Sequence, residues 1–249
     1  MGNLDFWKDW KEKTDQEIEY IKSLEKTINL ILRHIPKEKI HSIYVKGSFV
    51  KRELTPKSDI DIVIITTDSR YLKKISNFSK EFKNKIKPSE IVTPYSIWEF
   101  KHCKSHHSKK KTSQPPYLFL CNLEHHKCIY GKAVDKKKYK IPSAKKILKY
   151  LIKYVEDYIP AYYKGESYGF LYLTKQVFWL RNMELIIKNG YSPHSFEGMA
   201  KITKNKNHII NNSMKLRKMK VIPRGKDQKI KKDFVEKLKK YLSNLKKLI

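Results

Sequence analysis

Residues 47–66, GSFVKRELTPKSDIDIVIIT, decide how the rest of the chain is interpreted. They begin with a Gly-Ser pair, continue through a polar loop and end in two aspartates and an aliphatic run. The run Ile60–Thr66 is rich in β-branched residues and has the length of a strand. Because side chains alternate along a strand, Asp59 and Asp61 are expected to share one face while the isoleucines beside them enter the core.

Two carboxylates on one face of a strand repel each other and raise each other's pKa unless a cation lies between them. With no His or Cys nearby in the strand, their oxygen ligands suit Mg²⁺ or Mn²⁺, which substrate phosphates can complete. Gly47 would let the backbone approach a phosphate closely, and Ser48 offers a hydroxyl and an amide as donors. Each feature alone also fits an ordinary turn or an exposed strand edge. Together they predict a metal–triphosphate site.

The segment 47–65 resembles the signature of the DNA polymerase β-like nucleotidyltransferase superfamily, in which a Gly-Ser pair precedes an Asp-x-Asp motif. The most similar group is that of minimal and aminoglycoside-type (streptomycin) nucleotidyltransferases, whose loops commonly read like the TPKSDID of residues 55–61. The resemblance implies that Asp59 and Asp61 bind the metal. It also implies that Ser58, with Gly47 and Ser48, helps to bind the triphosphate of the donor.

Relatives usually carry a third carboxylate on a later strand, and Glu90 in SEIVTPYS occupies that place. The resemblance implies that Glu90 acts as the general base or as a further metal ligand. Glu99 competes for this role, but it lies where a helix is expected to begin and fits a first-turn carboxylate better. Lys51 and Arg52 stand where many relatives have Arg-Gly, so a phosphate contact is the one role considered for them.

The implied fold is α+β: an N-terminal nucleotidyltransferase-type mixed β-sheet flanked by helices, followed by a C-terminal helical bundle. Besides Ile60–Thr66, strands are expected at residues 43–45 and 90–95. The three- and four-residue spacing of apolar residues predicts a helix over residues 15–35, and a second helix is expected over 71–86. Residues 101–116 lack any period and contain Pro-Pro, which predicts a mobile loop.

Beyond Pro142 the pattern becomes helical, with helices expected over 144–158, 169–188 and 226–249. The last of these carries one apolar stripe, with lysines over the rest of its surface. We therefore expect a nucleotidyltransferase catalytic domain at residues 1–141 and a helical substrate-binding domain at residues 142–249. The helical half also resembles, weakly, the bundle of the streptomycin and spectinomycin group.

The charge is strongly unbalanced, because 55 Lys and Arg face 25 Asp and Glu and give a formal net charge of +30. Residues 142–249 hold 25 basic and 8 acidic side chains, against 30 and 17 in residues 1–141. Part of this excess fits the lysine usage of an AT-rich genome, and the rest predicts a field that attracts phosphates. A basic second half favours an anionic acceptor such as RNA.

A small-molecule acceptor of aminoglycoside type is the other reading of the second half. Glu156, Asp157 and Glu166 could form an acidic patch for a cationic drug, although each also fits a solvated helix surface. Aromatic side chains could stack on nucleic-acid bases, although at helical spacing they fit a packed core better: Tyr162, Tyr163, Tyr168, Tyr172, Phe178 and Trp179.

Other signals exclude several classes of protein. The chain has no apolar run long enough for a membrane span and no signal-peptide pattern at its start, and its three cysteines do not suggest a disulfide framework. These features predict a cytoplasmic protein without a membrane partner. His and Cys residues between 102 and 128 lack regular zinc spacing. Arg181 and His194 are too far apart for the Arg-His motif of a linked ribonuclease.

Two functions follow from these observations. The first is transfer of a nucleoside monophosphate, AMP from Mg-ATP or another nucleoside triphosphate, to a hydroxyl group with release of pyrophosphate. The acceptor would be a small molecule of aminoglycoside type or RNA. The second is a basic RNA- or partner-binding protein on a catalytically decayed scaffold, including a toxin or antitoxin-type member. The presence of Asp59, Asp61 and Glu90 together favours the first function.

Overall fold

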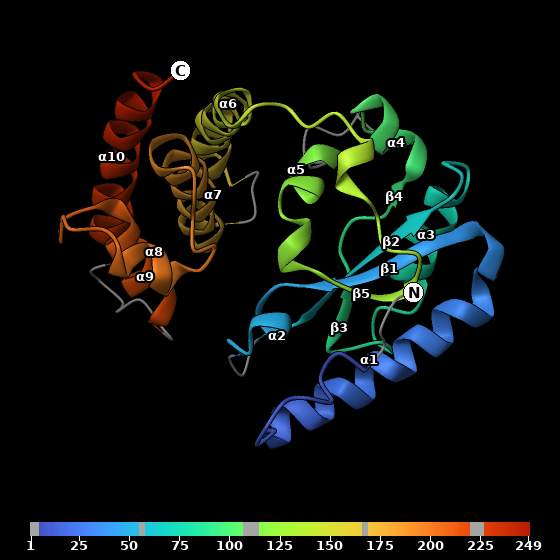
Figure 1. The fold of residues 1–249 in the computed structure, drawn as a ribbon. Coiled ribbons are helices and arrows are strands. Elements are labelled where there is room, and N and C mark those ends of the chain that lie inside the picture. The colour runs from blue at the N-terminus through green and yellow to red at the C-terminus, as the bar shows by residue number, and fades with distance from the viewer. Residues whose placement is uncertain (1–4, 55–57, 107–114, 166–168, 220–226) are drawn as a thin grey trace. The chain divides into compact units, whose positions relative to one another are not determined.

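The computed structural model describes residues 5–54, 58–106, 115–165, 169–219 and 227–249. The chain divides into two compact units, Met1–Ile141 and Pro142–Ile249 (Figure 1). The first unit is a mixed β-sheet with helices on both faces, and the described part of the second is helical. This architecture confirms the expected α+β class. The assignment of the units as catalytic and substrate-binding domains stays a prediction.

The sheet of the first unit is ordered β3-β2-β1-β5, with β4 pairing β2 beyond the end of β3. The central strand β2 (Ile60–Thr66) pairs antiparallel with β1 (Ile40–Lys46), which pairs antiparallel with β5 (Lys127–Gly131). Along its other edge, β2 pairs parallel with β3 (Ser89–Ile91) and β4 (Tyr95–Ser96). Residues on β2 therefore lie between β1 and the later strands.

The strands agree with the sequence-based expectation to different degrees. β2 has the expected bounds, and β1 extends beyond both ends of the expected 43–45. The single strand expected over 90–95 is wrong, because it is divided into β3 and β4 around Pro94. Proline has no N–H to donate to a neighbouring strand, which explains the break. β5 was not expected at all.

The two faces of the sheet are covered by different helices (Figure 1). α1 (Asp15–His34) and α3 (Tyr71–Glu81) contribute to a core with the buried isoleucines of β1 and β2. On the other face, α4 (Ile97–His102) and α5 (Pro116–Cys121) pack their phenylalanines against Tyr44 of β1 and Val63 and Ile65 of β2. The remaining helices of this unit are short: α2 (Ser48–Lys51) and three 3₁₀ turns at Lys37–Lys39, Leu123–His125 and Lys136–Lys138.

Helix ends follow local capping. α1 begins after Thr14, whose side chain and that of Glu17 form a capping box, and it ends one residue before the expected 35. α3 ends at Glu81 instead of residue 86, so the expectation for its last turn is wrong. Part of the predicted loop at 101–116 is helical, and its residues 107–114 lie outside the described residues.

The second unit is a helical bundle. α7 is buried over most of its length, and it packs against α6 and α9. In α10, the apolar stripe expected from the sequence is buried at Phe234, Leu238, Tyr241, Leu242 and Leu245. The helices of this unit have these bounds: α6 (Ala144–Tyr163), α7 (Phe170–Asn189), α8 (Phe196–Lys201), α9 (Ile209–Lys218) and α10 (Asp227–Lys246). α8 follows the Asn-Gly break at residues 189–190, where the resemblance to the streptomycin and spectinomycin group implies a helix. α9 was not among the expected helices, and α6 continues through Pro160.

Among the described residues, none of the helices combines the length and the apolar character needed to cross a membrane.

Candidate active site

The sheet brings two of the three predicted acids side by side. Asp61 on β2 is the register partner of Glu90 on β3. Side chains of register partners leave the sheet on the same face, so both carboxylates lie on the face that α4 and α5 cover further along the strands. This juxtaposition joins residues that are far apart in the sequence.

The predicted alternation of side chains between the two faces of β2 is present around Asp59 and Asp61. Ile60 and Ile62 are fully buried in the core beneath the sheet, whereas Asp59 is exposed and Asp61 is half-buried. Asp59 directly precedes β2 and is two residues before Asp61, so it extends the same face at the end of the strand. Asp59, Asp61 and Glu90 are therefore collected at one end of the sheet.

Glu90 responds electrostatically to both aspartates. Burial of its carboxyl raises the pKa, and hydrogen bonding with Asp59 and the charges of Asp59 and Asp61 raise it further. Lys83 acts in the opposite direction but does not reverse the shift. The three acids thus behave as one electrostatic group.

Gly47 fits its predicted role for a steric reason. Its φ of 84° lies in the region that favours glycine, and an added Cβ would stand 2.7 Å from Oδ2 of Asp61. Any side chain here would occupy space directly against the carboxylate. The backbone of the Gly-Ser turn can therefore approach Asp61 closely, which a phosphate site beside that acid requires.

The two predicted serines lie at the ends of the same loop. Ser48 begins α2 and is half-buried. Ser58 immediately precedes Asp59, and its carbonyl accepts a hydrogen bond of 2.6 Å from the Tyr20 hydroxyl of α1. This bond fixes the chain where it enters β2, a contribution of Tyr20 that no sequence motif indicated. Triphosphate binding by the two serines stays a prediction.

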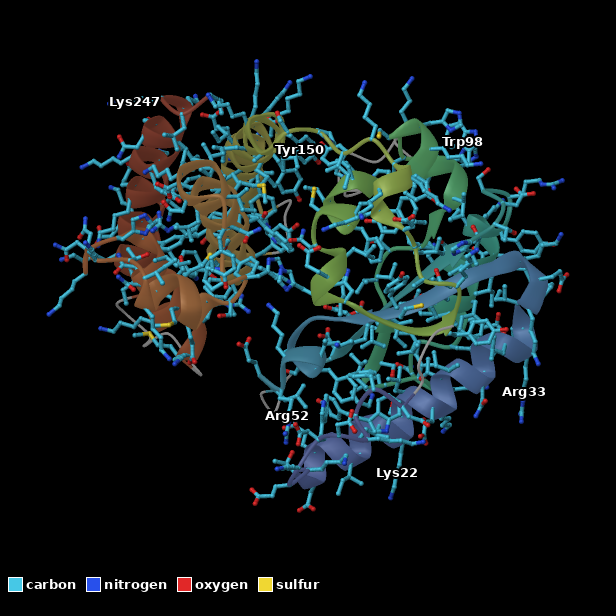
Figure 2. All side chains as sticks on the ribbon, viewed as in Figure 1. Lys22, Arg33, Arg52, Trp98, Tyr150 and Lys247 are labelled. Atoms are coloured by element: carbon cyan, nitrogen blue, oxygen red, sulfur yellow. The ribbon has the colours of Figure 1, made fainter. Side chains whose placement is uncertain are left out.

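Arg52 does not fit the phosphate role considered for it. The side chain of Arg52 is labelled in Figure 2. Its guanidinium donates to Glu17 at 2.7 and 3.0 Å, and also to the backbone carbonyls of Lys11 and Glu12. It also lies over the Trp10 ring. These contacts tie α2 to the start of α1, so Arg52 is engaged in the fold. Glu17 lies 35 positions before Arg52, and nothing in the motif pairs the two residues.

Glu99 is confirmed as a first-turn carboxylate. It forms a capping box with Ser96 at the start of α4, and its other oxygen accepts the backbone N–H of His106 at 2.7 Å. Both oxygens of this buried side chain are therefore used locally. Glu90 keeps its place as the third acid of the candidate site.

The donor chemistry of this site fits a divalent cation such as Mg²⁺. Three carboxylates from one end of the sheet offer hard oxygen ligands, and burial together with the two neighbouring aspartates raises the pKa of Glu90. In the part of the chain that the structure describes, no three His, Cys, Asp or Glu side chains are already gathered closely enough to hold a metal ion. Rotation of the three side chains would be needed for all of them to enclose one ion.

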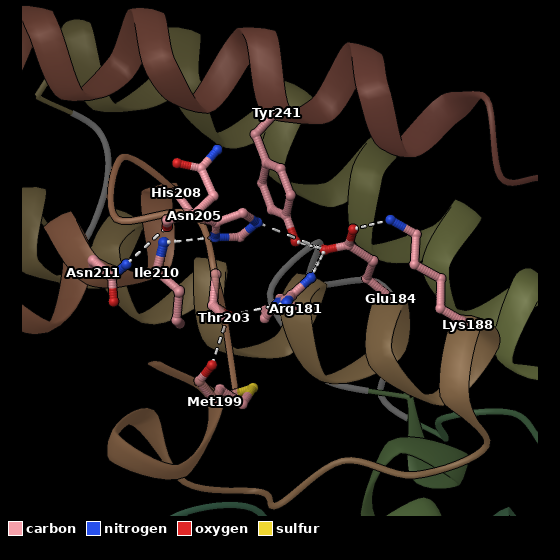
Figure 3. Close-up of polar contacts among 10 residues, drawn as sticks. All are labelled: Arg181, Glu184, Lys188, Met199, Thr203, Asn205, His208, Ile210, Asn211 and Tyr241. Carbon is pink, nitrogen blue, oxygen red and sulfur yellow. Dashed lines mark hydrogen bonds and ion pairs between the residues drawn. The ribbon is translucent and has the colours of Figure 1, made fainter. Parts of the chain in front are cut away.

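The second unit contains a different carboxylate cluster, centred on Glu184 of α7 (Figure 3). Its oxygens accept from Arg181 at 2.7 Å, Lys188 at 2.7 Å and the Tyr241 hydroxyl at 2.5 Å. Arg181 also donates to Thr203, and the His208 ring lies 3.9 Å from Glu184. This network connects α7, the segment after α8, the start of α9 and α10.

The aromatic side chains considered for base stacking are mostly engaged within the second unit. Phe178 is buried against His194 and Phe196, and the Tyr172 hydroxyl lies 2.9 Å from that of Tyr154. Tyr163 is 58% exposed. Tyr168 and Glu166 lie outside the described residues. A stacking surface built from the whole set is therefore not supported.

Comparisons with known proteins agree with this geometry. Residues 25–108 match the family model described as "Polymerase beta, Nucleotidyltransferase", and this range contains all six predicted site residues. A crystal structure of spectinomycin adenyltransferase AAD(9) from Enterococcus faecialis, with ATP and spectinomycin, is similar to this chain with a TM-score of 0.53 and 18% sequence identity. The similarity covers 90% of this chain and 98% of that chain, and it shows a shared fold. No curated protein sequence matches the chain.

Proposed function

We propose that this protein transfers a nucleoside monophosphate, AMP from Mg-ATP, to a hydroxyl group and releases pyrophosphate, as the match of residues 25–108 to a polymerase β-type nucleotidyltransferase model supports. The observation that carries this proposal is the pairing of Asp61 with Glu90 on one face, with Asp59 beside them and Gly47 against Asp61. A structural role would not collect three mutually repelling acids at one end of a sheet.

In this reaction the oxygen of the acceptor hydroxyl attacks the α-phosphorus, and the bond from that phosphorus to the bridging oxygen of the β-phosphate breaks. The electron pair leaves with pyrophosphate. Glu90 is the acid proposed to accept the hydroxyl proton, because its carboxylate lies beside Asp61 on the same face of the sheet. A Mg²⁺ ion held by Asp59 and Asp61 would neutralise charge on the phosphates.

The phosphate tail of the donor would lie at the Gly-Ser turn. Gly47 leaves space beside Asp61, and Ser48 and Ser58 lie at the two ends of the loop that separates β1 from β2. Backbone amides and hydroxyls are suitable donors for phosphate oxygens. Positioning of the donor and neutralisation of its charge would supply most of the rate enhancement.

Two acceptor classes have separate support. The fold shared with a spectinomycin adenyltransferase supports a small molecule of aminoglycoside type. The formal net charge of +30 supports an anionic acceptor such as RNA, because lysine side chains bind phosphates without regard to sequence. Both acceptors present the hydroxyl that the reaction needs. A cytoplasmic location, where ATP and either acceptor are available, belongs to the same proposal.

The proposal is tested by incubating the protein with Mg²⁺ and α-labelled ATP, GTP, CTP or UTP in parallel reactions. Each reaction contains total RNA, spectinomycin or streptomycin, and pyrophosphate release and label transfer are both measured. We expect label on one acceptor class together with stoichiometric pyrophosphate. Absence of both products with every donor and acceptor would instead support the binding protein on a decayed scaffold, whose RNA affinity should not depend on Asp59 or Asp61.

A further inference from the structure

The row of register partners that contains Asp61 and Glu90 continues across the sheet. Lys46, the last residue of β1, is the register partner of Asp61. On the far side of β1, Val45 is opposite Lys127 at the start of β5. In an antiparallel pair the next residue along β1 meets the preceding residue of its partner, so Lys46 is followed by His126. The row therefore reads Glu90, Asp61, Lys46, His126.

His126 shares the face of the other three residues. It has extended backbone angles, with φ of −112° and ψ of 150°, so the alternation of β5 continues back to it. Cys128, two residues later, packs against the core on the α4 and α5 face, and the His126 ring contacts Phe119 of the same core at 4.8 Å between centroids. The imidazole is thus placed at the end of this core, on the side of the acids.

One ring nitrogen of His126 has no partner within the described part of the chain. Its Nδ1 is buried and makes no hydrogen bond there. Such an atom has lost its hydrogen bonds to water and gained none in return, which is unfavourable, so buried polar atoms are nearly always paired in folded proteins. A ligand that supplies the missing partner would remove this cost.

Positive charge surrounds the same ring. Burial lowers the pKa of His126 to about 3, and the nearby charges of Lys46, His125 and Lys51 contribute to the shift. Lys51 itself is desolvated, which lowers its pKa. His126 is therefore a neutral ring near the side chains of Lys46 and Lys51, and an anion placed there would interact favourably with both lysines.

We propose that Lys46 and His126 form the subsite for the phosphate tail of the donor nucleotide, with Nδ1 of His126 contacting a phosphate oxygen. This inference rests on the proposed nucleotidyl transfer. The row is divided into an acidic half, Glu90 and Asp61, and a basic half, Lys46 and His126. A metal-bound triphosphate presents the matching pair of charges, a cation toward the carboxylates and phosphate oxygens toward the lysine and the imidazole. The neutral imidazole donates its Nδ1–H to the phosphate oxygen, and Lys46 supplies the charge.

The inference is tested by calorimetric titration of the full chain, in Mg²⁺ buffer, with ATP, inorganic tripolyphosphate and adenosine. His126→Phe keeps a ring against Phe119 and removes both nitrogens, and His126→Asn restores a polar atom near the position of Nδ1. Lys46→Met removes the charge and keeps the length of the side chain. His102→Phe is the matched control, because His102 is stacked on Trp98 and hydrogen-bonded to its carbonyl, away from the row.

We expect His126→Phe and Lys46→Met each to weaken ATP and tripolyphosphate binding by about tenfold or more, because each loses a direct phosphate contact. His126→Asn should recover part of this loss, and His102→Phe should bind as the wild type does. Adenosine affinity should not change in any variant. Equal ATP and tripolyphosphate affinity in the wild type, His126→Phe and Lys46→Met would overturn the inference, as would an equal loss of adenosine binding.

The outcome is separable from that of the proposed function. If no acceptor is modified but tripolyphosphate binding still depends on His126 and Lys46, the subsite stands and the transfer proposal fails. If the wild type releases pyrophosphate and the two variants do so with unchanged Michaelis constants for ATP, the transfer proposal stands and the subsite fails. If His126→Phe unfolds, the phosphate binding of Lys46→Met and His126→Asn still tests the proposed subsite. Binding of an oligoribonucleotide that depends on His126 while ATP binding does not would also overturn the donor-tail assignment.

Discussion

Glu90 in the first unit and Glu184 in the second have opposite electrostatic surroundings. Burial alone would raise the pKa of Glu184, but hydrogen bonds from Lys188, Tyr241 and Arg181 outweigh it and the pKa is lowered (Figure 3). For Glu90, burial acts in the same direction as its two acidic neighbours, and the pKa is raised. Among the described residues, the groups that lower the pKa outweigh burial at Glu184, whereas Lys83 does not outweigh burial and the two aspartates at Glu90.

The difference separates a structural carboxylate from a candidate functional one. A buried acid surrounded by hydrogen-bonded cations holds helices together, and removing it leaves those cations uncompensated. An acid beside other acids destabilises the folded state by repulsion. Such an arrangement is typical of functional sites, where a bound ligand offsets the repulsion. Substitutions in the two clusters should therefore change different measured quantities.

The largest effect is expected for Asp61→Asn. Loss of this carboxylate should reduce pyrophosphate release by about a thousandfold, since charge stabilisation at the phosphates depends on it. The thermal midpoint should stay the same or rise, because repulsion with Glu90 is relieved. Activity and thermal unfolding are measured on the same preparations.

Asp68→Asn is the matched control for Asp61→Asn. Asp68 follows the other end of β2 and is paired with Arg70, so its substitution should leave activity unchanged. If Asp61→Asn lowered the midpoint as much as a core substitution while keeping its activity, the interpretation of the acids as a catalytic group would be wrong.

The next effect is expected for Glu184→Gln, and it concerns stability. Removing the charge leaves Arg181 buried without its partner, which should destabilise the second unit by about 3–5 kcal/mol. Chemical denaturation measures this change. Glu197→Gln breaks an exposed pair with Lys218 and should give no resolvable change. Equal stability of the two variants would mean that the Glu184 network does not hold the helices together.

The sequence was sufficient to predict the parts of the fold that depend on local pattern. The β-branched run of β2 and the apolar spacing of α1 gave their bounds to within a residue. β5 was missed because CNLEHHKCIYG mixes polar and apolar residues and its pairing with β1 is non-local. α8 and α9 are short and weakly periodic, so their helical structure depends on packing against α7, which the local sequence pattern does not indicate.

The candidate site also has a part that could be predicted from a local motif and a part that depends on the tertiary fold. Asp59, Asp61, Gly47 and Ser48 belong to one contiguous motif, which made them visible in the sequence. The contact of Arg52 with Glu17 joins residues of different elements, and no local rule predicts it. Lys46 and His126 lie in one row with Asp61 only because of how β1 pairs with β2 and β5. This pairing is non-local, so the row could not be predicted from the sequence.

A smaller effect is expected for Gly47→Ala. The positive φ and the space against Asp61 are both unsuitable for a Cβ, so the folded state should lose about 1–3 kcal/mol. The added methyl group should also displace the Asp61 carboxylate and lower the activity of the folded fraction. Gly165→Ala tests strain alone, because its φ is 72° and nothing lies near its Cβ position. A similar loss of activity in both variants would show that strain, and not the contact with Asp61, is responsible.

For each pH unit, the smallest effect is a pH dependence of stability in the second unit. Burial and the charge of Arg181 lower the pKa of His208 from 6.5 to about 4, although Glu184 acts in the opposite direction. Between these values the unfolded chain binds a proton that the folded chain does not. Stability should therefore fall as the pH falls from 6.5 to about 4, by at most about 1.4 kcal/mol per pH unit.

His208→Asn should reduce this slope and keep the start of α9, because asparagine replaces the ring as the cap that accepts from Ile210. Denaturation at a series of pH values compares the two proteins. An unchanged slope in His208→Asn would assign the pH dependence to other groups, such as the buried His126.

The most direct test of the contrast between the two clusters is the effect of Mg²⁺ alone on thermal unfolding. If a divalent cation binds the acids of the first unit, Mg²⁺ at tenfold its dissociation constant should stabilise the wild type by about 1.4 kcal/mol. It should not stabilise Asp61→Asn, and it should stabilise Glu197→Gln as it does the wild type. Equal stabilisation of the wild type and Asp61→Asn would contradict the account.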